Sequence, residues 1–74
     1  MMTTVTLKVN GASRTFECPA DERFSVLGLL VRLELDAKKV AVECNEEIVP
    51  RSRYADTILG DGDALEIVHF IGGG

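Results

Sequence analysis

Hydrophobic and polar residues alternate over the first part of the chain with the period of a half-buried β-strand. Across residues 4–9 the apolar side chains fall on one side, and the threonines and a lysine fall on the other. Asn10-Gly11 follows, and this pair tolerates the positive φ angles of a type I′ turn. A second strand-like run covers residues 12–18 and is stopped by Pro19, which has no N–H for a ladder. The chain is therefore predicted to begin with a β-hairpin.

One segment in the middle of the chain has helical periodicity. Ser25 is a candidate N-cap for a helix over residues 26–35, whose apolar face consists of Val26, Leu29, Leu30 and Leu33. Leu27 and Val31 fall on another side. We interpret them as the flanks of the same buried stripe, with a partner-facing patch as the alternative. Gly28 is expected to let a strand approach the helix closely.

The second half of the chain is predicted to add three strands. Residues 40–44 alternate, with Cys44 on the core side, and residues 48–49 form a short strand before Pro50. A loop then leads into a helical turn that ends near Leu59. The last strand, residues 64–71, alternates less cleanly at its end, which suggests that both of its faces are covered. This order predicts an α+β fold of the β-grasp type, with a mixed sheet of about four to five strands and one main helix.

The end of the chain carries the main functional clue. Ile71 is followed by Gly72, Gly73 and Gly74, and an extended run of three glycines reaches about 10 Å. We expect residues 1–71 to form the domain and residues 72–74 to form a flexible tail that carries a carboxylate into another protein's active site. A loose terminus without function is the alternative.

Composition and charge exclude several classes of function. The chain is 46% hydrophobic and 27% charged, which is typical of a globular domain, and Arg32 interrupts its longest apolar segment, so we expect no membrane span. A net charge of −4 argues against nucleic acid binding and favours a basic protein partner. No secretory signal is recognisable at the N-terminus, so a cytoplasmic location is expected.

The cysteines and the histidine offer little for catalysis. Cys18 and Cys44 are too few for a thiolate metal site, even with His69, so no metal or bound cofactor is expected and a [2Fe–2S] ferredoxin of this fold is disfavoured. Free thiols are expected in a reducing cytoplasm. A Cys–His nucleophile pair is the formal alternative, but His69 has no identifiable partner and is expected at the surface.

Several short motifs, in this order and spacing, resemble the ubiquitin-like sulfur carriers, and most closely the thiamine-biosynthesis carriers of the ThiS type. The matching segments cover nearly the whole chain, and the most specific are residues 48–52, 61–63, 65–68 and the glycine terminus. Three positions depart from the family pattern. Glu34 and Glu46 stand where similar sequences often have a turn glycine, so both turns are expected to differ in shape, and Tyr54 stands where tryptophan is frequent.

The resemblance implies a co-substrate with no catalytic residues of its own. A partner adenylating (E1-like) enzyme would use ATP and Mg²⁺ to join AMP to the carboxylate of Gly74, and sulfur from a sulfur-donor protein would replace AMP to form a thiocarboxylate. Thiazole synthase would then accept the sulfur. Gly72 and Gly73 would thread into the partner sites, and Phe70 and Ile71 would contribute to docking. The alternatives are the small subunit of molybdopterin synthase, a ubiquitin-like protein modifier and an inert interaction domain.

Overall fold

The computed structural model describes residues 1–70, and residues 71–74 lie outside the described part. The strands, the α-helix and the two 3-10 helices are, in chain order, β1 Met2–Val9, β2 Ala12–Pro19, α1 Val26–Arg32, η1 Ala37–Lys39, β3 Val40–Cys44, β4 Glu47–Val49, η2 Arg51–Arg53 and β5 Ala64–His69. Within residues 1–70, no helix is long and apolar enough to cross a membrane.

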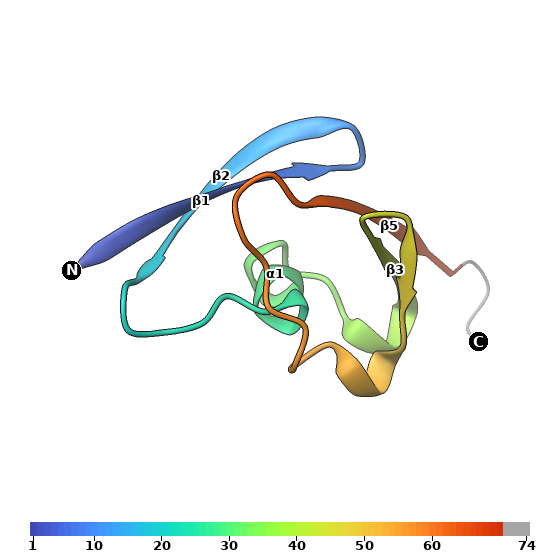
Figure 1. Ribbon diagram of the computed structural model, residues 1–74. Helices are drawn as coiled ribbons and strands as arrows, with labels where there is room; N and C mark the ends of the chain where they lie inside the picture. Colours follow the sequence, from blue (N-terminus) through green and yellow to red (C-terminus); the bar gives the residue numbers. More distant parts are fainter. Residues whose placement is uncertain (71–74) are drawn as a thin grey trace.

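The five strands form one mixed sheet in the order β2-β1-β5-β3-β4, and α1 covers one of its faces (Figure 1). β1 and β5 run parallel, while the other neighbouring strands are antiparallel. We call the face under α1 the inner face and the opposite face the outer face. A central last strand between the first hairpin and the β3–β4 pair defines the β-grasp fold, so the predicted fold class is confirmed.

The core lies between α1 and the inner face of the sheet. Its most deeply buried side chains, all below 2% exposure, are Leu7, Val26, Leu29, Leu30, Val40, Val42 and Leu65. These residues come from both apolar periods of the sequence, the two-residue period of the strands and the helical period of α1. The two patterns therefore predicted correctly which strand and helix residues are buried in the core.

The helix ends earlier than its predicted boundary at residue 35. Arg32 is its last residue, and Glu34 takes a left-handed backbone with φ 59°. Glu34 N–H donates to the Val31 carbonyl at 3.0 Å, and Leu35 N–H donates to the Leu30 carbonyl at 2.9 Å. This pair of bonds is a Schellman motif, which usually has glycine at the left-handed position. The motif forms with glutamate instead, and it stops a helix that the leucine pattern would continue.

Two interpretations of α1 are wrong. Leu27 is 38% exposed and Val31 is 67% exposed, so they do not flank a buried stripe. Gly28 does not admit a strand, because a Cβ there would meet only the Phe24 ring and the Ser25 hydroxyl oxygen, 3.4 and 3.5 Å away. The predicted N-cap is confirmed, since the Ser25 hydroxyl oxygen accepts from Gly28 N–H at 3.0 Å.

The hairpin turns share one backbone conformation. Asn10 and Gly11 have φ 50° and 83°, as the predicted type I′ turn requires. Asn45 and Glu46, between β3 and β4, have φ 52° and 69°. The second turn therefore keeps a left-handed backbone at two residues although it has no glycine.

Two predictions in the second half need correction. The helical turn lies at Arg51–Arg53, at the start of the loop, and not near Leu59. β5 ends at His69, and Val68 is 59% exposed, so the second face of its end is open and not covered. Tyr54 belongs to the core at 4% exposure, and its hydroxyl donates to the Val40 carbonyl at 3.2 Å.

Candidate functional site

The candidate site begins where the chain leaves the sheet at the end of β5. Phe70 is the last described residue, whereas Ile71 and the glycines 72–74, which the sequence assigns to docking and to the reaction, lie outside the described residues. Phe70 N–H donates to the Lys39 carbonyl at 2.9 Å, which continues the β3–β5 ladder beyond His69. The sheet therefore fixes the chain up to the residue that precedes Ile71.

The Asn10 side chain holds β5 on its other side. Its Oδ1 accepts from Ile67 N–H at 2.7 Å, and its Nδ2 donates to the Ile67 carbonyl at 3.2 Å. The side-chain amide thus replaces a backbone partner at the point where β1 has already ended. The sequence assigned Asn10 only to the turn, because nothing in the local pattern indicates a bond to a residue so far along the chain.

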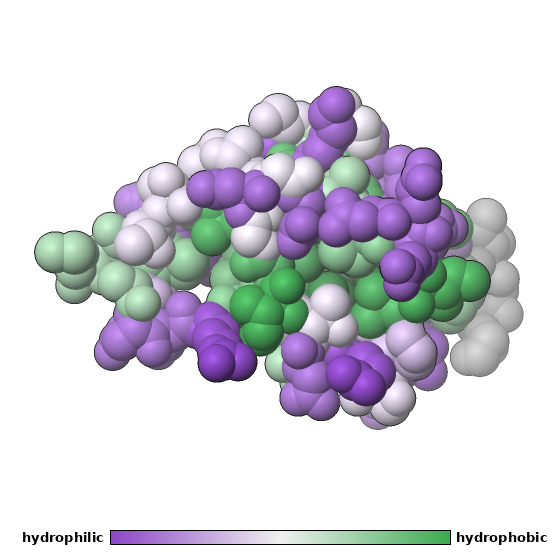
Figure 2. Space-filling model, in the orientation of Figure 1, coloured by the Kyte–Doolittle hydropathy of each residue, from purple (hydrophilic) through white to green (hydrophobic). Residues whose placement is uncertain are grey.

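Strand register gathers exposed apolar side chains on the outer face near the end of β5. Val68 lies opposite Ala41, Ile48 lies opposite Glu43, and Phe70 follows Val68 by two residues on the same side of the strand. Ile48, Val68 and Phe70 are 79%, 59% and 50% exposed, and we call these three residues the outer-face patch. Figure 2 shows hydrophobic surface at the end of the molecule where the described chain stops.

Two carboxylates border the outer-face patch. Glu43 lies directly opposite Glu66 in the β3–β5 pair, and Glu43 also lies opposite Ile48 in the β3–β4 pair. Like charges on opposite residues of two strands destabilise a sheet. An apolar surface with this acidic border suits a partner surface that combines apolar and basic side chains.

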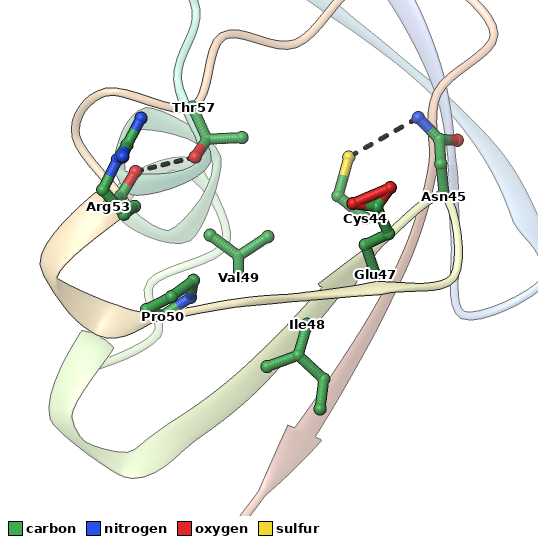
Figure 3. A pocket seen from close by; sticks show the side chains of 8 residues that line it. All are labelled: Cys44, Asn45, Glu47, Ile48, Val49, Pro50, Arg53 and Thr57. Carbon is green, nitrogen blue, oxygen red and sulfur yellow. Dashed lines mark hydrogen bonds between the residues drawn. The ribbon is translucent and has the colours of Figure 1, made fainter.

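A hollow of 370 Å³ opens at the turn between β3 and β4, and its lining includes Cys44, Asn45, Pro50 and Arg53 (Figure 3). Asn45 Nδ2 donates to Cys44 Sγ at 3.7 Å. Burial raises the pKa of the Cys44 thiol, and the negative charges of Asp63 and Glu47 raise it further. This environment disfavours the thiolate that a nucleophile needs.

The Cys–His alternative does not form in the described part of the chain. His69 is exposed and pairs with Val40, whereas Cys44 pairs with Leu65 at the other end of the same ladder. Cys18 is buried in the core, and both cysteines are free thiols. Among residues 1–70, no group of three or more potential metal ligands comes together. What the geometry does present is an exposed apolar face at the end of β5.

Comparison with known proteins identifies this arrangement. The model of the ThiS family matches residues 7–74, which include the last strand and the glycine terminus. The chain belongs to the ThiS family. A sulfur carrier protein ThiS from Bacillus subtilis (strain 168) is 46% identical over 50 residues, which are 68% of this chain and 76% of the relative.

A solved structure and a longer relative extend the comparison. The crystal structure of the thiamine biosynthesis protein ThiS from Geobacter metallireducens superposes with a TM-score of 0.74 at 38% identity, covering 93% of this chain and 99% of that one. A thiazole synthase from Paramagnetospirillum magneticum is 52% identical over 68 residues, or 92% of this chain. This chain spans 20% of the length of that thiazole synthase.

Proposed function

We propose that the protein is a sulfur carrier in thiamine biosynthesis, and that it acts as a co-substrate and not as an enzyme. The observation that carries the proposal is the ThiS family match, because it runs to Gly74 and so includes the glycine terminus. The exposed face beside β5 supports it, since a carrier must dock on each enzyme that works on its end. The two free thiols agree with a reducing compartment, and we place the protein in the cytoplasm.

The proposed chemistry takes place on the carboxylate of Gly74. A partner adenylating enzyme joins this carboxylate to the α-phosphorus of ATP, which forms an acyl adenylate and releases pyrophosphate. Hydrosulfide supplied by a sulfur-donor protein then attacks the acyl carbon, AMP leaves with the electron pair of the broken C–O bond, and the S–H proton is lost. The product is a thiocarboxylate. ATP and Mg²⁺ belong to the partner's active site, while Gly72 and Gly73 let that site close around the acyl carbon without a side chain in the way.

We propose thiazole synthase as the acceptor of the sulfur. The thiazole synthase from Paramagnetospirillum magneticum supports this step, because a segment like this chain forms part of that longer protein. Two units joined in one chain meet at a high effective concentration, which is useful when one must deliver a group to the other. The family match favours this acceptor over the pterin of a molybdopterin synthase and over a lysine of a modified protein.

The outer-face patch supplies the docking energy in this proposal. Phe70 is half exposed and adjoins the tail, so its contact with a partner would place the following residues at the partner's active site. Glu43 and Glu66 would steer a basic partner surface onto the patch. Ile71 would complete the contact at the point where the tail begins.

The docking role of the outer-face patch can be tested by introducing a charged side chain into it. We expect Val68→Asp to lower kcat/KM for sulfur loading by the adenylating enzyme about tenfold or more, because it buries an unpaired carboxylate in an apolar contact. Met2→Asp is the matched control, since Met2 is similarly exposed at 55% but lies at the start of β1. Equal loading of both variants and the unchanged protein, measured by intact mass over time, would overturn the docking role. Loading that is normal but is followed by transfer only to a pterin precursor would reassign the carrier to molybdopterin synthesis.

A further inference from the structure

A second hollow lies on the α1 side of the sheet, between the edge strand β2 and α1, and we call it the β2–α1 groove. Its volume is 400 Å³, and side chains from both elements and from the loop between them line it. The lining includes Leu27 and Val31, which α1 exposes at 38% and 67%. In the described part of the chain, Glu22 is the only carboxylate that lines it, beside Arg23 and Arg32.

β2 is an edge strand, and half of its backbone groups face away from β1. Thr6 of β1 uses its backbone N–H and C=O for bonds of 2.7 and 2.9 Å to the loop at residues 61–62, on the side away from β2. Thr15, its partner in β2, therefore points its own N–H and C=O outward. The alternation of an antiparallel pair gives the same outward direction to Ser13 and Glu17.

Arg32 confirms this direction of the β2 backbone. Its Nη2 donates to the Glu17 carbonyl from α1, across the mouth of the groove. The bond shows that the outward groups of β2 are within reach of a donor on the α1 side. An extended peptide laid beside β2 could use the outward groups of Ser13 and Thr15, because a free strand edge pairs readily with another strand.

Two adjacent aromatic rings, with a cation stacked at each end, follow the boundary between β2 and α1. Arg14 stacks over the Phe16 ring at 5.6 Å, the Phe16 and Phe24 rings are 5.6 Å apart, and Arg32 stacks over Phe24 at 5.7 Å. With Arg23, three of the five arginines of a chain with net charge −4 lie along this boundary. The rings hold two of the guanidinium groups in place, so they are already oriented for carboxylates.

We propose that the β2–α1 groove binds an extended segment of a partner protein, which adds as a further strand along β2. The segment carries apolar side chains at alternate positions, facing Leu27 and Val31, and carboxylates at the ends of this apolar run, facing Arg14 and Arg32. Backbone bonds to β2 supply affinity, and the alternate side chains supply specificity. The surface is separate from the outer-face patch, so one partner can occupy it while another holds the tail. The proposal does not depend on the reaction at Gly74.

The probe is a seven-residue peptide with aspartate, valine, isoleucine and aspartate at alternate positions and threonine between them. In an NMR titration of the ¹⁵N-labelled protein, we expect shifts at the backbone amides of Ser13, Thr15 and Glu17 and around Leu27 and Val31. A peptide with lysine in place of both aspartates should bind at least about tenfold more weakly. Failure of the aspartate peptide to bind at millimolar concentration overturns the proposal. Shifts centred on the outer face, or equal binding of the lysine peptide, also overturn it.

Protein variants and methylated peptides separate the charge contribution from the backbone contribution. Arg14→Glu should weaken the aspartate peptide about tenfold, whereas Lys8→Glu, which makes the same charge change on the outer face of β1, should change its affinity less than about twofold. N-methylation of alternate peptide amides gives two peptides, one without the N–H donors that face β2 and one without the donors that face away. We expect the first peptide to lose binding and the second to keep it. An equal effect of both methylations would contradict strand addition.

Discussion

The turn between β3 and β4 holds a residue other than glycine in a left-handed backbone conformation. Glu46 has φ 69° and an exposed side chain. A left-handed backbone costs a residue with a Cβ about 1–2 kcal/mol, and glycine loses about 0.5–1 kcal/mol more conformational entropy on folding. The central values of the two ranges differ by about 0.75 kcal/mol, so Glu46→Gly is predicted to raise the free energy of unfolding by roughly this amount. The melting temperature should rise by about 3–6 °C for a domain of this size.

Glu47→Gly is the matched control for this change. Glu47 is the next residue, is also exposed and lies in β4, where glycine has no backbone advantage. We expect this variant to lose about 0.5–1 kcal/mol. Both values come from urea unfolding followed by circular dichroism, with thermal unfolding as a check. A lower stability of Glu46→Gly, similar to that of Glu47→Gly, would refute the argument that the turn holds glutamate in a strained conformation.

Two further predictions concern the buried Tyr54 and the partly buried Cys44. Tyr54→Phe removes the hydroxyl that donates to the Val40 carbonyl at 3.2 Å and should lower the free energy of unfolding by about 1 kcal/mol, as measured by urea unfolding; an unchanged value would contradict a contribution from this bond. Because burial raises the pKa of Cys44, alkylation of this thiol in a Cys18→Ala background should reach half of its maximal rate at a higher pH than free cysteine does. Because the folded thiol has a higher pKa than the unfolded thiol, the free energy of unfolding should fall as the pH rises from the unfolded pKa through the folded pKa. Glu47→Gln removes one of the negative charges that raise this pKa and should shift the pH midpoint of alkylation downward. A midpoint at or below that of free cysteine would contradict the predicted pKa shift.

The strands and the fold class could be predicted because their signals are local. Two-residue alternation and the Asn10-Gly11 pair located the first hairpin, and β3 has the predicted bounds. The end of α1 could not be predicted in the same way. Its leucines continue at helical spacing, and Glu34 occupies a left-handed position that sequence patterns associate with glycine. The exposure of Leu27 and Val31 depends on how far the sheet extends under α1, which is a tertiary property.

The candidate site is only partly visible in the sequence. The glycine terminus and Phe70 could be singled out from their position in the chain. The pairing of Glu43 with Glu66 depends on the register of two strands that lie far apart in sequence, and local periodicity does not determine that register. The bonds from Asn10 to Ile67 depend on the same long-range placement.

In our proposal the carboxylate of Gly74 receives sulfur, and this exchange can be followed by the intact mass of the protein. The protein is incubated with ATP, Mg²⁺, a sulfur source and the adenylating enzyme of the same cell, and a variant without Gly74 serves as the control. We expect a mass gain equal to the exchange of one oxygen for one sulfur, located in the glycine tail and absent from the control. No gain with an enzyme that loads another carrier under the same conditions would contradict the claim.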